Sequence, residues 1–178
     1  MGENEMTSID RLKQLGEQVA PGWMSLCNDF VLDVPAFAQA PASSGHHPGP
    51  HQELGGLALH TLEVAEFADE MARYDFVLRQ RAYVAAVFHD YGKIFEYAFV
   101  DGKATNLPFR HRVGHVVYGW HHFNRAATLG ASDEEYEEIG HALLAHHGRR
   151  EWGSPVEPQT RLAYILHTAD MMSSRGVL

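Results

Sequence analysis

Apolar residues recur along most of the chain at the three- and four-residue spacing of amphipathic helices. We expect a first helix from Thr7 or Ser8 to about Ala20, where Pro21-Gly22 ends it. The same spacing predicts a helix that opens at Gly55-Gly56 and further helices at about 76–91, 111–129 and 133–147. A last helix is expected after Pro158.

Two stretches break this pattern. Proline, glycine and serine between Pro41 and His51 exclude regular structure, inside a loop that we place at 37–56. The alternation from Phe95 to Lys103 around Asp101-Gly102 predicts a small β-hairpin near residues 95–105. The expected fold class is therefore all-α, a bundle of five or more helices, with this hairpin as its β-structure.

The length and composition predict one domain. A chain of 178 residues with 45% hydrophobic residues can bury a single core. No repeat or shift in composition marks a boundary, so we expect one domain over 1–178. Its parts would be an N-terminal helical segment at 1–36, the loop at 37–56 and a metal-binding core at 57–174.

Charge and cysteine content narrow the setting. The formal net charge of −9 gives no long-range attraction to nucleic acid, so a polyanion would have to bind through a local basic patch. Cys27 is the only cysteine, which excludes an internal disulfide and suits a reducing compartment. No apolar run approaches the roughly 18 residues of a membrane span, and no secretory leader is seen. We expect a cytoplasmic protein without a membrane segment.

Histidines and aspartates gather at the inward faces or ends of five predicted helices. They are His60, His89, Asp90, His115, His146, His147 and Asp170. A single inward histidine is more often hydrogen-bonded in a core than bound to a metal. Ordinary packing, however, has no reason to place such groups on five helices at once. Imidazole nitrogens and carboxylate oxygens are ligands of transition metals, so the set predicts a metal site.

Other histidines are assigned less directly. In the helix at about 111–129 we expect Val113 and Val117 to be buried and His111, His115 and His122 to share a face that lines a cleft. His51 is interpreted as a structural or surface residue. His167 is interpreted as a support for a metal ligand.

Short motifs surround the candidate ligands: Leu59-His60-Thr61, His89-Asp90-Tyr91-Gly92-Lys93, Gly114-His115, His146-His147-Gly148 and Ala169-Asp170. From about Phe37 to Asp170 the chain thereby resembles the HD-domain superfamily of metal-dependent phosphohydrolases. His46-His47 and the stretch from Glu151 to Val156 are similar to the HD domain of bacterial 3′-to-5′ exoribonucleases that pair it with an OB fold. HD segments of relaxase-associated proteins are similar as well.

The resemblance implies two divalent metal sites, one formed by His60, His89, Asp90 and Asp170 and the other by His115, His146 and His147. Two cations would activate a water and neutralise charge on a phosphoryl group. Asp90, Lys93 and His115 are then the catalytic candidates. The ligand types admit Mn²⁺, Fe, Co²⁺, Ni²⁺ or Zn²⁺, and family habit puts Mn²⁺ first.

Five residues are candidates for substrate binding. Lys93, Arg149 and Arg150 can bind phosphate oxygens. The alternative is that each is an exposed charged side chain that contacts only solvent. His46 and His47, in the long loop, either touch the substrate or only order the loop.

The leading hypothesis is a metal-dependent phosphohydrolase that acts on a nucleotide or a short oligonucleotide through a metal-activated water. Its partners would be a phosphorylated small molecule, a nucleotide or short nucleic acid. The sequence is also compatible with a homo-oligomer. One alternative is a di-iron oxygenase of the HD type. Another is a non-catalytic HD module that binds a nucleotide or a partner protein.

Overall fold

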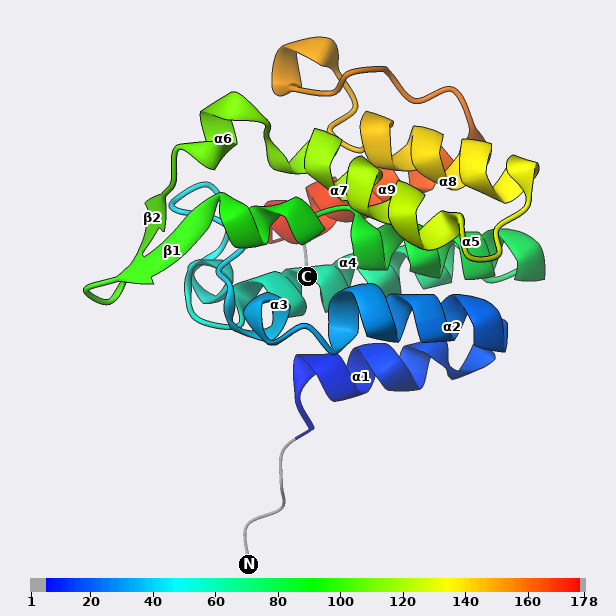
Figure 1. Ribbon diagram of the computed structural model, residues 1–178, viewed down its shortest axis with the longest axis horizontal. Coiled ribbons are helices and arrows are strands. Elements are labelled where there is room, and N and C mark those ends of the chain that lie inside the picture. Colours follow the sequence, from blue (N-terminus) through cyan, green and yellow to red (C-terminus); the bar gives the residue numbers. More distant parts are fainter. Residues whose placement is uncertain (1–5, 177–178) are drawn as a thin grey trace, which may run out of the picture.

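A computed structural model describes residues 6–176 of the chain, which form nine α-helices and one small antiparallel sheet (Figure 1). The helices are α1 Ser8–Leu15, α2 Pro21–Cys27, α3 Pro35–Gln39, α4 Gly56–Ala72, α5 Phe76–Phe88, α6 Phe109–Arg112, α7 His115–Ala127, α8 Asp133–Ala145 and α9 Arg161–Ser174. The strands are β1 Tyr97–Val100 and β2 Lys103–Asn106. The predicted all-α class and the hairpin near 95–105 are confirmed.

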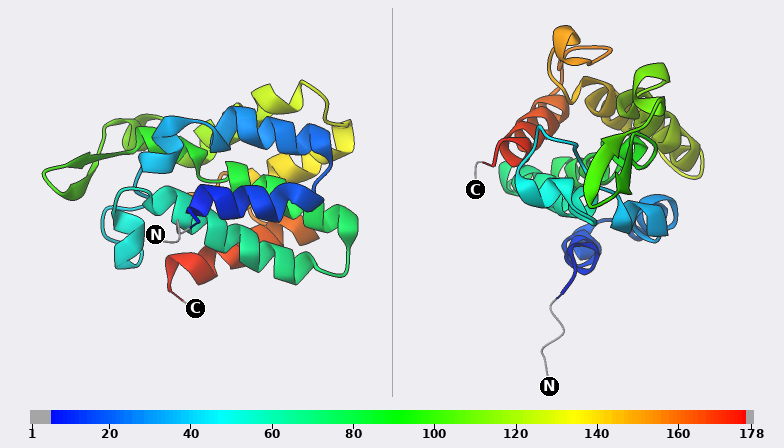
Figure 2. Two further views of the ribbon diagram at one scale, coloured as in Figure 1. Left: turned by 90° about the horizontal axis from the view of Figure 1, so that it is seen from below. Right: turned by 90° about the vertical axis from the view of Figure 1, so that its left-hand side faces the viewer.

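The core lies where α4, α5, α8 and α9 meet, because α4 packs against α5 and α9 while α8 packs against α5, α7 and α9. Fully buried side chains such as Leu62, Phe88, Leu143 and Leu166 fill this space. Figure 2 shows α1 and α2 along one side of this body and the β-hairpin projecting from one end. No helix in the described residues is long and apolar enough to cross a membrane.

The first helix is shorter than predicted. Thr7 caps it through a hydrogen bond from the Asp10 backbone N–H, but it ends at Leu15 and not near Ala20. A tight 3₁₀ turn follows at Gly16–Gln18. A Cβ at Gly16 would lie 2.6 Å from the Tyr83 hydroxyl oxygen, so the chain turns where α5 approaches it.

The predicted helix at 111–129 is broken in two, and this break corrects its buried face. Gly114 has a φ of 77°, in the left-handed region, and separates α6 from α7. The register therefore shifts, so that Val116 is buried while Val113 and Val117 are 47% and 44% exposed. The expectation that both of those valines are buried was wrong.

The face expected to carry three histidines does not exist either. His111 is exposed, whereas His122 is buried and its Nε2–H donates to the Phe30 carbonyl oxygen at 2.8 Å. The His122 ring also stacks on Tyr91, with ring centroids 3.9 Å apart. Of the three, His115 alone faces the predicted metal site.

Helix α5 ends at Phe88, earlier than the predicted Tyr91, and a 3₁₀ turn continues from Tyr91 to Phe95. His89 and Asp90 therefore lie at the break between the two. A Cβ at position 92 would lie 2.6 Å from the His115 Cα, too close for a side chain. The glycine therefore lets the start of α7 approach this break. This contact brings His115 close to Asp90.

Candidate metal centre

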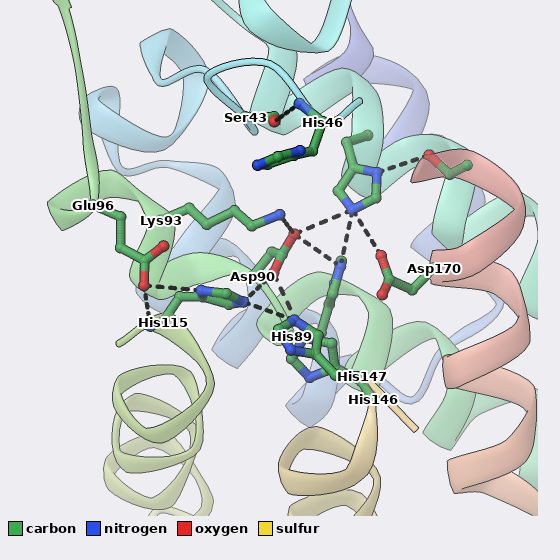
Figure 3. Close-up of polar contacts among 12 residues, drawn as sticks. Ser43, His46, His89, Asp90, Lys93, Glu96, His115, His146, His147 and Asp170 are labelled. Carbon is green, nitrogen blue, oxygen red and sulfur yellow. Dashed lines mark hydrogen bonds and ion pairs between the residues drawn. The ribbon is translucent and has the colours of Figure 1, made fainter. Parts of the chain in front are cut away.

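The structure brings all seven predicted ligands together at one end of the bundle (Figure 3). They come from five helices: His60 from α4, His89 and Asp90 from the end of α5, His115 from the first turn of α7, His146 and His147 from the residues after α8, and Asp170 from α9.

Asp90 lies at the middle of this cluster. Its Oδ2 is 3.1 Å from His60 Nε2 and 3.3 Å from His89 Nε2. Its Oδ1 is 3.5 Å from His115 Nε2 and 3.7 Å from His146 Nε2. The carboxylate thus faces two groups of imidazoles, one with each oxygen.

The outer nitrogens of three histidines are fixed by backbone carbonyl groups. His89 Nδ1 donates to Ala86 at 2.7 Å, His146 Nδ1 to Leu143 at 2.7 Å and His147 Nδ1 to Trp152 at 2.9 Å. A carbonyl oxygen can only accept, so each Nδ1 carries the hydrogen and each Nε2 presents a lone pair to the centre.

His60 is oriented by a buried chain of polar groups that the sequence analysis did not identify. His60 Nδ1 lies 2.7 Å from Ser173 Oγ, which donates to Glu63 Oε2 at 2.6 Å. Since the serine hydrogen goes to Glu63, His60 Nδ1 donates to the serine oxygen. His51 Nε2 lies 3.0 Å from the same Glu63 oxygen. Burial by itself would raise the pKa of Glu63, but hydrogen bonds from His51 and Ser173 lower it below its ordinary value.

Glu96 orients His115, as Glu63 and Ser173 orient His60. Its Oε1 accepts from the His115 backbone N–H at 2.5 Å and lies 2.9 Å from His115 Nδ1. Burial alone would raise the pKa of Glu96, yet these hydrogen bonds from His115 lower it. The carboxylate therefore accepts from Nδ1–H and turns the His115 Nε2 lone pair towards Asp90.

Lone pairs consequently face each other across the centre. His60 Nε2 and His89 Nε2 are 3.3 Å apart, and His115 Nε2 and His147 Nε2 are 3.0 Å apart. Neither oxygen of Asp90 has a hydrogen bond of good geometry, and both oxygens are buried, as is His146 Nε2. Facing acceptors beside a carboxylate repel one another unless a cation lies between them.

The charge states of His146, His147 and Asp90 suit metal binding. Burial lowers the pKa of His147 to about 4 and that of His146 well below its ordinary value, so both rings are neutral at pH 7. Burial would raise the pKa of Asp90, but its polar neighbours, His89 first and then the Lys93 ammonium, lower it well below its usual range. The atoms of the predicted ligands form two compact groups, His60, His89, Asp90 and Asp170 in one and His115, His146 and His147 in the other; His60 also lies in a third group with His47 and His51. These residues fit divalent cations.

Comparison with known proteins now gives the family. The family described as "HD domain" matches residues 57–174, about two thirds of the chain. The chain belongs to the HD-domain family. The predicted family is confirmed.

Curated relatives of this HD domain carry the name "3'-5' exoribonuclease YhaM". The protein of Listeria welshimeri is 33% identical over 140 residues, which cover 78% of this chain and 44% of the relative. That of Geobacillus sp. (strain WCH70) is 32% identical over 141 residues, covering 78% and 42%. That of Bacillus velezensis is 26% identical over 198 residues, covering 99% and 61%. The chain thus spans less than half of the first two relatives. No solved structure matches significantly.

A pocket of about 540 Å³ opens over the HD centre. Six predicted substrate or metal residues lie on its wall: His46, His47, Lys93, His115, His147 and Asp170. In Figure 3 His46 reaches from the loop over Asp90 and Lys93. Lys93 Nζ is 2.5 Å from Asp90 Oδ2, so this buried ammonium stands at the border between centre and pocket.

The predicted arginines lie elsewhere. Arg149 packs over the Trp152 ring, 4.8 Å from its centroid, and Arg150 is exposed; neither is on the pocket wall. Arg110 and Arg175 are on that wall instead. A phosphate contact by Arg149 or Arg150 stays a prediction.

His167 does contact a candidate ligand through the backbone, since its Nδ1 lies 2.8 Å from the His146 carbonyl oxygen. Because a carbonyl oxygen accepts, His167 donates. His51 is buried and bonded to Glu63, which fits its interpretation as a structural residue.

Proposed function

We propose that this HD domain hydrolyses phosphoester bonds of short RNA or of nucleotides, with a centre of two divalent cations and an attacking water. One observation carries the proposal. The two oxygens of Asp90 face two separate groups of imidazole lone pairs, as expected of a carboxylate shared by two ions. The names of the relatives favour hydrolysis of RNA over an oxygenase or a binding module.

We assign the first ion to His60, His89, Asp90 and Asp170, and the second to His115, His146, His147 and Asp90. When bound, divalent cations supply an activated water and polarise a phosphoryl oxygen. The donor set of imidazole and carboxylate without thiolate admits Mn²⁺, Fe, Co²⁺, Ni²⁺ or Zn²⁺. Mn²⁺ is our first choice on the resemblance to the HD family alone. We also place the protein in the cytoplasm, where its single buried Cys27 would stay reduced.

The chain's own groups would orient the substrate. Lys93 and Arg110 put positive charge on the pocket wall, which suits a phosphate despite the net charge of −9. Burial lowers the pKa of His47 to about 2, so this ring is neutral at pH 7 and can accept a hydrogen bond from the substrate.

The test is hydrolysis of a 5′-labelled RNA decamer by chelator-treated protein reloaded with Mn²⁺. We expect shortened products with the wild type and a loss of more than about 100-fold in Asp90→Asn, because both ions lose their shared ligand. Asp29→Asn, an equivalent change at an exposed site, is the control. Equal hydrolysis by the two variants would contradict the proposal.

A further inference from the structure

Trp152 has a place in the molecule that core packing does not explain. It ends the short 3₁₀ turn Arg150–Trp152, and its side chain lines the pocket over the HD centre together with Lys93 and His147. The residue is 45% exposed. A large indole left at the wall of a pocket is available to a ligand.

The backbone of Trp152 ties this indole to the centre. Its carbonyl oxygen accepts from His147 Nδ1 at 2.9 Å, and its N–H donates to the Arg149 carbonyl oxygen at 3.0 Å. Gly153, with a φ of 99°, then closes the turn. The main chain therefore holds His147, while the side chain is free for another role.

The surroundings of the indole suit a flat, electron-rich ligand. The guanidinium of Arg149 lies 4.8 Å from the ring centroid and its side chain is exposed, so it can shift to cover a guest. Tyr97 also lies on the pocket wall, but it is only 7% exposed, and Arg110 donates to its hydroxyl oxygen at 2.6 Å. Of these two rings, Trp152 is the one that offers surface.

We propose that Trp152 is a stacking platform for the nucleobase of the nucleotide whose phosphate lies at the HD centre, with Arg149 as its mobile cover. The inference rests on the proposed function and deepens it, because it names the residue that would bind the base of the substrate. Stacking uses the face that every base has, so recognition by the platform is tolerant of sequence.

The test is binding of AMP and of ribose 5-phosphate to Mn²⁺-loaded protein, followed by calorimetry and by tryptophan fluorescence. The two ligands share the 5′-phosphate and ribose, so their difference reports the base. We expect AMP to bind about tenfold more tightly and to quench fluorescence, as stacking of one base predicts. In Trp152→Leu the preference for AMP should disappear, and in Trp152→Tyr most of it should remain.

Trp120→Phe is the control, because Trp120 lies on a different pocket between α7 and α8 and should leave the preference unchanged. Equal binding of AMP and ribose 5-phosphate by the wild type would overturn the platform. So would a Trp152→Leu variant that keeps the preference, or one that loses both ligands equally, which would show a structural role.

The outcome is separable from that of the proposed function. If RNA is not hydrolysed but AMP is preferred through Trp152, the hydrolase proposal fails and the platform stands. If RNA is hydrolysed without any preference for a base in binding, the hydrolase proposal stands and the platform fails.

Discussion

The two halves of the HD centre are built differently, although both supply imidazoles to Asp90. We call His60, His89 and Asp170 the deep half and His115, His146 and His147 the mouth half. His60 and His89 are buried away from the pocket, whereas His115 and His147 reach its wall; Asp170 reaches the wall as well, and His146 is fully buried. Burial alone therefore does not separate the two sets of donors.

The two halves differ in the residues that hydrogen-bond the outer nitrogens of their histidines, which we call the supports. His60 in the deep half is held by Ser173 on α9 and Glu63 on α4, inside two long helices. In the mouth half, His115 is held by Glu96 at the end of a 3₁₀ turn, and His147 by the short turn at Trp152. Long helices packed in the core open less readily than short turns. We therefore expect the deep ion to bind more tightly.

The largest expected effect comes from removing one donor from each half. Asp170→Ala should lower the affinity for the tighter Mn²⁺ ion by more than about 100-fold, because a buried ligand is lost. His147→Ala should leave that affinity nearly unchanged and weaken the other ion. Equilibrium dialysis against Mn²⁺ measures both. Equal losses of the tighter ion in both variants would erase the distinction between the halves.

The next effect comes from the supports. Glu63→Gln and Ser173→Ala should weaken the tighter ion by about 10- to 100-fold, because His60 loses the acceptor that fixes its tautomer. Glu96→Gln should act on the weaker ion by a similar factor. Glu66→Gln, on the same helix as Glu63 but exposed, is the matched control. The same dialysis decides, and supports without effect on either ion would contradict the account.

Chelation should produce a moderate change in stability. An ion present at 100 times its Kd stabilises the folded state by about 2.7 kcal/mol. For a chain of this size that corresponds to roughly 5 to 10 °C in Tm. The shift should be smaller in Asp170→Ala than in His147→Ala, as calorimetry with and without EDTA would show. The opposite order would place the tighter ion in the mouth half.

The smallest expected effect lies far from both halves. Cys27 on α2 is fully buried, and burial raises the pKa of its thiol. We expect no reaction with a thiol reagent in native protein, before or after chelation. If chelation exposed Cys27, the centre and the N-terminal helices would unfold together, and the change would not be confined to the centre.

The candidate ligands could be predicted from sequence because each one lies at an inward position or an end of a periodic helix. His60 and His89 follow apolar stripes, and Asp170 lies one turn beyond Leu166. Their supports could not be predicted with equal ease. Glu63 lies one helical turn from His60, which was an available signal, but its bond to Ser173 joins residues 110 positions apart.

The wrong details have local causes. A single glycine, Gly114, broke a predicted helix and rotated the face that carries Val113 and Val117. The predicted phosphate contact of Arg149, inferred from its position after the paired histidines, stays a prediction; in the structure its guanidinium lies over Trp152. Periodicity describes a helix face, whereas neither the backbone of a turn nor the direction of a long exposed side chain has a comparable pattern.

The central claim is that Asp90 is shared by two ions. The most direct measurement is the metal content per chain, by mass spectrometry of protein reloaded with Mn²⁺ and dialysed. The account predicts two ions in the wild type and loss of both in Asp90→Ala, with Asp29→Ala unchanged. One ion in the wild type, or two that survive in Asp90→Ala, would contradict it.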